Sequence, residues 1–319
     1  LRLPRDDFET MGEGWTPLIP SVWGECSVLM KCEHMMPTGS FKDRGTAVLF
    51  NYLKQSGISE ILEDSSGNAG ASYAAYAAAF RLLARILVPA SAPDAKKTQI
   101  AAMGACMEAI EGTRQDVAEA ALSASKETFY ASHNWQPYFI EGTKTLAFEI
   151  WEQSGFSLPD NVIVPLGYGS NVVGLHLGFK ELMKSGEIDR MPRIFGAQAK
   201  NCAALYAAWN AGGKAVRFEM GATIADGIAS EKPVRVAEVM AALQETGGGV
   251  EVASGAEIAE AFELFAHRGF FVEPTTATAG AVLKNLLHIG KIDKSELSIV
   301  VLTGHGLKAM DKIENLAGN

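Results

Sequence analysis

The sequence predicts an α/β protein built from two parallel-sheet α/β domains. Short apolar runs rich in β-branched residues alternate along the chain with amphipathic stretches of helical period. Such alternation is typical of parallel sheets whose crossover helices cover both faces. A chain of 319 residues is also long enough to form two domains, each around its own apolar core.

The expected strands are short and largely apolar, which is the pattern of strands buried between helices. They are residues 58–63, 82–88, 161–166, 193–197 and 298–302. The stretches between them carry apolar residues at helical spacing. The clearest of these expected helices are residues 46–55, 113–127, 144–153 and 256–267. An alanine-rich helix is expected from Ala69 to Phe80.

The segment Pro37–Gly45 places one lysine, Lys42, among small and turn-forming residues where the chain leaves a loop and enters a helix. The positive end of the helix dipole and partial burial both favour the uncharged amine over the ammonium form. An uncharged amine can form an imine with an aldehyde. The alternative for this segment alone is a solvated Lys-Asp-Arg surface turn.

A glycine-rich loop follows the expected strand Asn161–Leu166 and precedes an apolar-periodic helix. The loop consists of Gly167, Tyr168, Gly169, Ser170 and Asn171. Glycines let backbone N–H groups converge on a phosphate, and the helix N-terminus adds positive potential. A dinucleotide-binding loop would have a third glycine where Val172 stands, so the loop suits one compact phosphate. An ordinary tight turn is the alternative.

An imine-forming lysine and a monophosphate-binding loop together indicate pyridoxal 5'-phosphate. Five segments of the chain are similar to motifs of one enzyme family, in the family's order: 14–18, 37–45, 65–72, 140–145 and 303–308. The chain thus resembles the tryptophan-synthase-beta superfamily, the fold-type II pyridoxal-phosphate enzymes, and within it the threonine synthases. Several matches in one order, from Gly14 to Lys308, are far more specific than any single match.

The resemblance implies a role for each matched segment. Lys42 is then the Schiff-base lysine and the proton shuttle at the substrate α carbon. Asn68 donates to the hydroxyl of the cofactor ring, the loop from Gly167 to Asn171 binds its phosphate, and Thr303 faces its pyridine nitrogen. A hydroxyl at that nitrogen, unlike a carboxylate, does not enforce a protonated ring, which suits elimination and replacement better than transamination.

The resemblance also implies a substrate, O-phospho-L-homoserine, which reacts with water to give L-threonine and phosphate. The turn before the alanine-rich helix offers hydroxyl and N–H groups to a substrate carboxylate, from Ser65, Ser66, Gly67 and Ala69. A helix N-cap supplied by Ser65 or Ser66 is the alternative for this turn. A phosphate dianion needs cationic donors. The candidates are Arg44, Lys97 and Lys144, each of which is also plausible as a surface charge.

Two departures from the threonine synthase pattern keep other functions open. The segment Thr223–Ala229 looks more like the serine/threonine dehydratases, and Ala309 stands where the family usually has aspartate. One alternative is therefore a pyridoxal-phosphate-dependent serine/threonine dehydratase (ammonia-lyase) or a related β-eliminating enzyme. Another is a catalytically silent relative that binds the cofactor without turnover.

The family layout implies a discontinuous large domain, residues 1–45 and 144–319, which binds the cofactor. A small mobile α/β domain, residues 46–143, is inserted in it, and the cofactor lies between the two. The resemblance also implies a homodimer.

Composition and charge favour a soluble enzyme acting on a small molecule. A net charge of −9 argues against nucleic acid and anionic membranes as partners. The alanine run is too short to cross a bilayer, and Leu1–Asp7 has no apolar signal core. Neither the six histidines nor the four cysteines have metal-ligand spacing, so no metal site is expected. The cysteines are typical of a reducing compartment, which favours a cytoplasmic location.

Overall fold

The computed structural model describes residues 8–92 and 94–317, and it divides into two compact units. Within the described residues, the smaller unit contains 8–13 and 36–143, and the larger unit contains 14–35 and 144–317. The segment Leu1–Asp7, expected to lack a signal core, lies outside the described residues. Both units combine a parallel sheet with covering helices, which confirms the expected α/β class.

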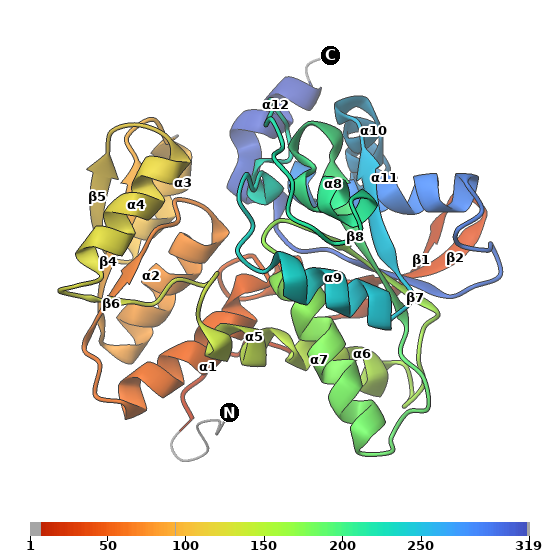
Figure 1. Cartoon of the computed structure of the whole chain (residues 1–319), viewed down its shortest axis with the longest axis horizontal. Helices are drawn as coiled ribbons and strands as arrows, with labels where there is room; N and C mark the ends of the chain where they lie inside the picture. Colours follow the sequence, from red (N-terminus) through yellow and green to blue (C-terminus); the bar gives the residue numbers. More distant parts are fainter. Residues whose placement is uncertain (1–7, 93, 318–319) are drawn as a thin grey trace. The chain divides into compact units, whose positions relative to one another are not determined.

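The smaller unit contains a four-stranded, fully parallel sheet in the order β5-β4-β3-β6 (Figure 1). Its strands are β3 (Glu60–Glu63), β4 (Leu83–Pro89), β5 (Cys106–Ile110) and β6 (Phe129–Tyr130). Its helices are α1 (Lys42–Gln55), α2 (Asn68–Phe80), α3 (Asp94–Ala102), α4 (Arg114–Ala124) and α5 (Pro137–Thr143). One apolar core joins α1, α2 and α5 to the sheet, and a second, smaller cluster joins α4 to Leu62 and Leu87. Helices therefore cover both faces.

Residues 36–45 belong to the smaller unit, whereas the expected layout assigned them to the large domain. The reason is that α1 is one continuous helix from Lys42, not from Thr46 as expected. Two glycines let α1 and α5 approach closely. A Cβ at Gly45 would lie 2.5 Å from the Phe139 ring, and a Cβ at Gly142 would lie 2.1 Å from the Arg44 carbonyl oxygen. The lysine segment is thus packed into the smaller unit.

The larger unit contains a six-stranded sheet in the order β1-β2-β10-β7-β8-β9. Its strands are β1 (Leu18–Trp23), β2 (Cys26–Lys31), β7 (Asn161–Pro165), β8 (Arg193–Ala199), β9 (Gly249–Ala253) and β10 (Ser298–Val301). All neighbours are parallel except β1, which forms an antiparallel hairpin with β2 at the sheet edge. The sequence did not predict this hairpin, whose turn includes Gly24 at φ +61°.

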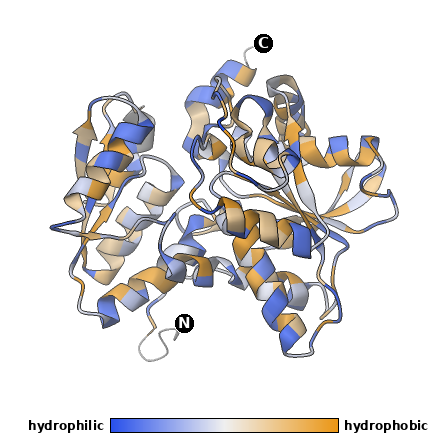
Figure 2. Ribbon diagram, viewed as in Figure 1, coloured by the Kyte–Doolittle hydropathy of each residue, from blue (hydrophilic) through white to orange (hydrophobic). Residues whose placement is uncertain are grey.

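Helices cover both faces of the larger sheet, and its strands are the more hydrophobic layer (Figure 2). The helices of this unit are α6 (Thr145–Gln153), α7 (Ser170–Lys184), α8 (Ala204–Asn210), α9 (Val236–Glu245), α10 (Gly255–Ala266), α11 (Pro274–His288) and α12 (Met310–Ala317). Short 3-10 turns lie at η1 (Glu33–Met35), η2 (Lys200–Cys202), η3 (Asp226–Ile228) and η4 (Gly306–Ala309). Helix α11 packs along β7, β8, β9 and β10, and its buried face is part of the main core.

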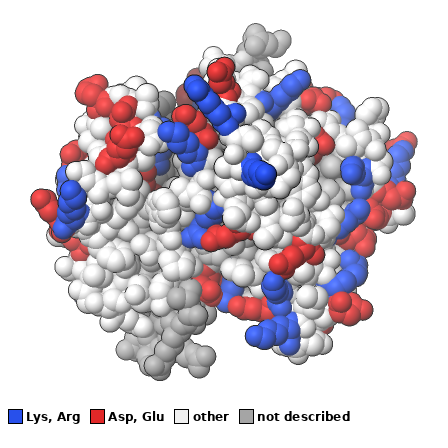
Figure 3. Space-filling model, in the orientation of Figure 1, with Lys and Arg blue, Asp and Glu red and all other residues white. Residues whose placement is uncertain are grey.

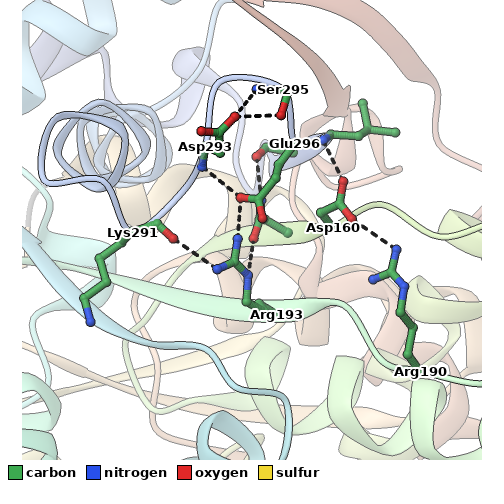
Figure 4. Close-up of polar contacts among 10 residues, drawn as sticks. Asp160, Arg190, Arg193, Lys291, Asp293, Ser295 and Glu296 are labelled. Atoms are coloured by element: carbon green, nitrogen blue, oxygen red, sulfur yellow. Dashed lines mark hydrogen bonds and ion pairs between the residues drawn. The ribbon is translucent and has the colours of Figure 1, made fainter.

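The amino edge of the larger sheet is occupied by a polar network (Figure 4). Arg193, the first residue of β8, donates to Asn161 Oδ1 at 2.8 Å and to the Lys291 carbonyl at 3.0 Å, and it pairs with Glu296. Asp160, just before β7, pairs with Arg190 at 3.1 Å and accepts the Leu297 N–H at 2.9 Å. These bonds hold the starts of β7, β8 and β10 together at the amino edge of the sheet.

Acidic and basic side chains are interspersed over the visible face of the molecule (Figure 3). Within residues 8–92 and 94–317, no helix is both long and apolar enough to cross a membrane. The same residues contain no cluster of three or more histidine, cysteine or acidic side chains that could hold a metal ion.

Candidate active site

Lys42 is the first residue of α1 and is half-buried. Its Nζ lies 4.8 Å from the centroid of the Phe41 ring and 5.6 Å from that of the Phe139 ring. The amine therefore lies at the positive end of a helix, against two aromatic rings. This is the local setting that the sequence predicted, and the fully solvated surface turn does not describe it.

Asp43, the next residue, is fully buried and bonds to three groups of the smaller unit. Its carboxylate accepts hydrogen bonds from the Thr38 N–H at 2.7 Å, the Thr38 hydroxyl at 2.6 Å and the Ser72 hydroxyl at 2.6 Å. Thr38 lies in the loop before Lys42, and Ser72 lies in the second turn of α2. Asp43 thus fixes the lysine loop to the helix that begins at Asn68.

The expected substrate loop follows β3 directly and ends at the N-terminus of α2. Gly67 is the N-cap residue of α2, and no side chain caps this helix end. The Ser65 hydroxyl instead accepts the Gly67 N–H at 3.3 Å, so neither serine acts as the N-cap. Since the first N–H groups of a helix have no intrahelical acceptor, this end favours an anion. Ser65, Ser66, Gly67 and Asn68 are half-buried, and Ala69 is buried.

A buried acid–imidazole pair in the smaller unit was not foreseen from the sequence. Glu63, the last residue of β3, is fully buried, and its Oε1 lies 2.7 Å from His133 Nδ1. Burial raises the pKa of Glu63 to about 7, against smaller lowering effects of Arg114 and of the His133 backbone N–H. Burial first, and then the charge of Lys42, lower the pKa of His133 well below its usual value. The pair therefore has Lys42 as an electrostatic neighbour.

The glycine loop of the larger unit joins the end of β7 to the start of α7. Gly169 is the N-cap of α7 at φ +96°, and a Cβ there would lie 2.2 Å from Val239 Cγ2. No side chain caps α7, and the buried Asn171 has its Oδ1 without a hydrogen-bond partner. Tyr168 and Gly167 are half-buried, and Ser170 is buried. A backbone cradle with an uncapped helix end fits an anion such as a phosphate, whereas the Asn171 amide oxygen can only accept a hydrogen bond from a donor.

Thr303 follows β10 at the same carboxyl edge and is buried, with 2% of its surface exposed. Its Oγ1 lies 3.0 Å from Thr276 Oγ1 in the first turn of α11. Next to it, a Cβ at Gly304 would lie 2.1 Å from Glu273 Oε1, so the Glu273 side chain packs directly against this glycine. The first turn of α11 therefore holds this loop closely.

The three candidate phosphate-binding cations have different settings. Lys97 lies on α3, which reaches the lysine loop through a 3.3 Å bond from Gln99 Nε2 to the Thr38 carbonyl. Arg44 is buried in the first turn of α1. Lys144 is buried in the larger unit, and its Nζ bonds to Glu181 Oε1 at 2.8 Å. Since Glu181 is 11 residues beyond Ser170 on α7, this ion pair lies roughly 16 Å along the helix from the glycine loop.

The expected site residues fall into two groups, one in each unit. The smaller unit contains Lys42, Arg44, Lys97 and the loop from Ser65 to Ala69. The larger unit contains Lys144, Thr303 and the loop from Gly167 to Asn171. In both units the loops in question leave the carboxyl ends of parallel strands, which is where open α/β sheets bind ligands.

Comparison with known proteins gives a consistent family. A family model described as "Pyridoxal-phosphate dependent enzyme" matches residues 9–304. The threonine synthase of Methanocaldococcus jannaschii is 35% identical over 308 residues, which cover 94% of this chain and 76% of that protein. The threonine synthase of Bacillus sp. (strain ULM1) is 36% identical over 307 residues, which cover 94% of this chain and 84% of that protein.

Solved structures agree at the level of the fold. The crystal structure of the T.th. threonine deaminase matches with a TM-score of 0.77 and 26% identity, covering 91% of this chain and 92% of that chain. The family match confirms the expected cofactor, pyridoxal 5'-phosphate, and with it the expectation of an enzyme. The chain belongs to the pyridoxal-phosphate-dependent enzymes and is a threonine synthase-like member of their fold-type II branch.

Proposed function

We propose that this protein is a threonine synthase-like lyase that converts O-phospho-L-homoserine and water to L-threonine and phosphate. The observation that carries the proposal is the similarity to threonine synthases, at 35% and 36% identity over 94% of the chain. The local structure of both candidate loops is compatible with it, since each presents an uncapped helix N-terminus to an anion.

In this proposal the residues divide the work by their chemistry. When bound, pyridoxal phosphate supplies the conjugated electron sink that stabilises negative charge at the substrate α carbon. Lys42 holds the cofactor and moves the proton at that carbon. The substrate carboxylate is bound by hydroxyl and N–H groups of Ser65, Ser66, Gly67 and Ala69.

The remaining residues hold the cofactor. Asn68 donates to the ring hydroxyl, and the loop from Gly167 to Asn171 binds the phosphate group of the cofactor. Thr303 faces the ring nitrogen. Arg44 and Lys97 are the cations proposed for the substrate phosphate. Lys144 has a weaker claim, because its charge is already paired with Glu181.

A serine/threonine dehydratase is the second candidate, favoured by two observations. The segment Thr223–Ala229 looks dehydratase-like, and one of the matching solved structures is described as a threonine deaminase. This segment contains η3, where the Gly227 N–H donates to Thr275 Oγ1 at 3.0 Å. A Cβ on Gly167 would lie 3.2 Å from Ile228 Cα, so the segment packs against the glycine loop.

The two functions separate in one pair of assays on one preparation. Threonine synthase activity releases inorganic phosphate from O-phosphohomoserine and forms threonine. Dehydratase activity releases ammonia and a 2-oxo acid from serine or threonine. The deciding quantity is the ratio of the two kcat/KM values. Serine or threonine turnover far above phosphohomoserine turnover would overturn the proposal and leave the cofactor assignment standing.

Variants of two lysines sharpen this assay. Lys97→Ala should weaken phosphohomoserine use by about 1–3 kcal/mol if Lys97 binds the substrate phosphate, and residual serine elimination should barely change. Lys126→Ala, an exposed lysine of the same unit, is the matched control. Lys144→Ala should be compared with Glu181→Ala. If both have the same effect, Lys144 acts through its ion pair and not through the substrate.

The proposal includes the homodimer, the cytoplasmic location and the mobility of the smaller unit that the family resemblance implies. Light scattering of the purified protein measures its oligomeric state directly.

A further inference from the structure

Lys42, Glu63 and His133 of the smaller unit lie close to one aromatic ring, that of Phe139. The Lys42 Nζ atom lies 5.6 Å from the centroid of this ring, and the centroid of the His133 ring lies 5.7 Å from it. Both oxygens of the Glu63 carboxyl group contact His133, Oε1 at 2.7 Å from Nδ1 and Oε2 at 3.3 Å from the backbone N–H. Glu63 has no exposed surface, and His133 is 5% exposed. Three groups that can change their charge are therefore neighbours, and two of them are buried.

The contact between Glu63 and His133 can exist in two charge states. An oxygen and a ring nitrogen at 2.7 Å need one proton between them. A protonated Glu63 donates this proton to Nδ1, whereas an ionised Glu63 accepts it from Nδ1–H. The histidine is neutral in both states, because burial lowers its pKa. The pair can thus gain or lose one proton without breaking the hydrogen bond. Burial raises the pKa of Glu63 to about 7, so both states are accessible near neutral pH.

The other ionisable groups around the pair contribute no variable charge. Asp64 and Arg114 form an ion pair at 2.8 Å, so their charges offset each other. Burial raises the pKa values of Tyr73 and Tyr130, so both phenols stay neutral. Among the described residues, the remaining group that acts electrostatically on both members of the pair is Lys42.

The charge of Lys42 and the charge of the pair depend on each other. A positive charge on Lys42 lowers the pKa values of Glu63 and His133. Proton binding at two coupled sites is reciprocal, so an ionised pair favours the ammonium form of the lysine. An ammonium at Lys42 and an ionised Glu63 have no net charge together. An uncharged lysine and a protonated Glu63 have none either, so neither state leaves a buried charge uncompensated.

We propose that the Glu63–His133 pair is a proton-binding site coupled to Lys42, which gains one proton when the lysine amine is uncharged and loses it when the amine becomes an ammonium ion. The inference rests on the proposed function, in which Lys42 moves the proton at the substrate α carbon. A group that accepts and returns a proton works best when its two forms are close in free energy. The coupled site keeps the cluster neutral in both forms. Glu63 and His133 are positioning residues here, because they act through Lys42.

The first test is the ionisation of Glu63, measured by infrared spectroscopy on the full chain without cofactor or substrate. The carbonyl stretch of a protonated carboxyl group is followed from about pH 5 to pH 9, a range around neutrality. The loss of one band in Glu63→Gln assigns it to Glu63. Lys42→Met removes the charge at similar length and should raise the midpoint of this band by at least about 0.5 pH unit.

Two further lysine variants are controls for this titration. Lys42→Arg keeps the positive charge and should give a midpoint near that of the wild type. Lys54→Met, at the exposed end of the same helix, should leave the midpoint unchanged. An unchanged midpoint in a folded Lys42→Met protein overturns the proposal.

The second test is the ionisation of Lys42 itself. Trace labelling with an amine reagent at a series of pH values, with the Lys42 peptide quantified by mass spectrometry, gives the pKa of this lysine. Glu63→Gln should lower that pKa by at least about 0.5 pH unit. Glu108→Gln is the matched control, because Glu108 is an exposed glutamate of the same unit, paired with Arg85 at 2.6 Å. An unchanged Lys42 pKa in folded Glu63→Gln overturns the proposal.

A third measurement needs no variant and remains possible if Glu63→Gln does not fold. Ring ¹⁵N resonances distinguish the Nδ1–H tautomer, the Nε2–H tautomer and the imidazolium form of histidine. In the wild type, one of the six histidines should change from Nε2–H to Nδ1–H as the pH rises, without an imidazolium form. If none does so, the proposal is overturned. Since no substrate or cofactor is present, a failed phosphohomoserine assay leaves all three results readable, and a failed titration leaves the proposed function standing.

Discussion

Ser72 donates a 2.6 Å hydrogen bond from its hydroxyl to Oδ1 of Asp43, across two helices of the smaller unit. Both side chains are fully buried. Asp43 directly follows Lys42 at the start of α1, and Ser72 lies one turn after Asn68 at the start of α2. The bond therefore links the helix that presents the proposed catalytic amine to the helix that presents the proposed ring contact.

Replacement of Asp43 by asparagine should destabilise the protein by about 2–3 kcal/mol. Three donors converge on the carboxylate, and an amide would direct its own N–H₂ group at one of them. Ser72→Ala, which removes one donor, should cost about 1 kcal/mol. Urea denaturation measures both effects, and Ser123→Ala, at an exposed serine of α4, is the control. Equal stability of Asp43→Asn and wild type would contradict a linking role for Asp43.

Lys42→Ala should abolish turnover and leave the fold intact, because the side chain is half-buried and only its amine is proposed to react. The visible absorption of the cofactor bound through an imine should disappear. Borohydride reduction of the wild type, followed by peptide mapping, should attach the cofactor to the peptide that contains Lys42. Recovery of the label on any other peptide would remove Lys42 from its proposed role.

Gly169→Asp should reduce the affinity for pyridoxal phosphate by at least ~10-fold, about 1.4 kcal/mol. The new side chain would meet Val239, at a φ of +96°, and would add a negative charge where a phosphate dianion is proposed to bind. Gly186→Asp is a matched control, because Gly186 has a φ of +81° just after α7 with nothing near its Cβ position. If both variants lose the same amount of affinity for pyridoxal phosphate, the loss is caused by backbone strain and not by a change in the phosphate-binding loop.

The Glu63–His133 pair predicts a distinctive pH dependence of stability. The raised pKa of Glu63, about 7, keeps one proton on the folded pair, while His133 stays neutral because its pKa is lowered. Between about pH 4.5 and 6.5 the unfolded chain also holds one proton, on histidine, so the pair contributes no slope. Below about pH 4.5 the unfolded chain gains the glutamate proton, and stability falls.

Glu63→Gln should remove the equality between the number of protons that the folded pair binds and the number that the unfolded chain binds. The folded variant then binds no proton at this pair, while the unfolded chain still protonates His133 below about pH 6.5. The stability of the variant relative to wild type should therefore rise with pH from about 4.5 to 6.5, with a slope near 1.4 kcal/mol per pH unit. Denaturation at several pH values measures this difference, and a flat difference would mean that His133 is charged in the folded protein.

Much of the fold could be predicted because local pattern and tertiary environment agree. Strands β7 and β10 are buried throughout and apolar after their polar first residues, Asn161 and Ser298, and the structure has both strands within one residue of their expected bounds. Helix α1 begins at Lys42, before the expected stretch 46–55, and Gly45 within it lies in close contact with Phe139. The β1–β2 hairpin was missed because it lies at the edge, where Ile19 and Val22 are exposed.

The parts of the candidate site that sequence reasoning found are contiguous motifs, such as the loops around Lys42 and Gly169. The parts it missed are contacts between distant positions. Glu63 and His133 are 70 residues apart, and Thr276 and Thr303 are 27 apart. One signal was available, since Glu63 ends an apolar strand at the edge where ligands bind. Only the parallel pairing of β3 with β6 brings His133 to that edge.

The order of strands in the larger sheet has a consequence for synthesis of the protein. Strand β10, near the end of the chain, lies between β2 and β7, and it pairs Ser298 with Val28. A ribosome therefore releases β2 long before its partner exists. The smaller unit, whose strands and helices all lie between Lys42 and Thr143, has every element it needs much earlier. We therefore expect the smaller unit to fold co-translationally. One edge of β2 stays unpaired until β10 has been synthesised.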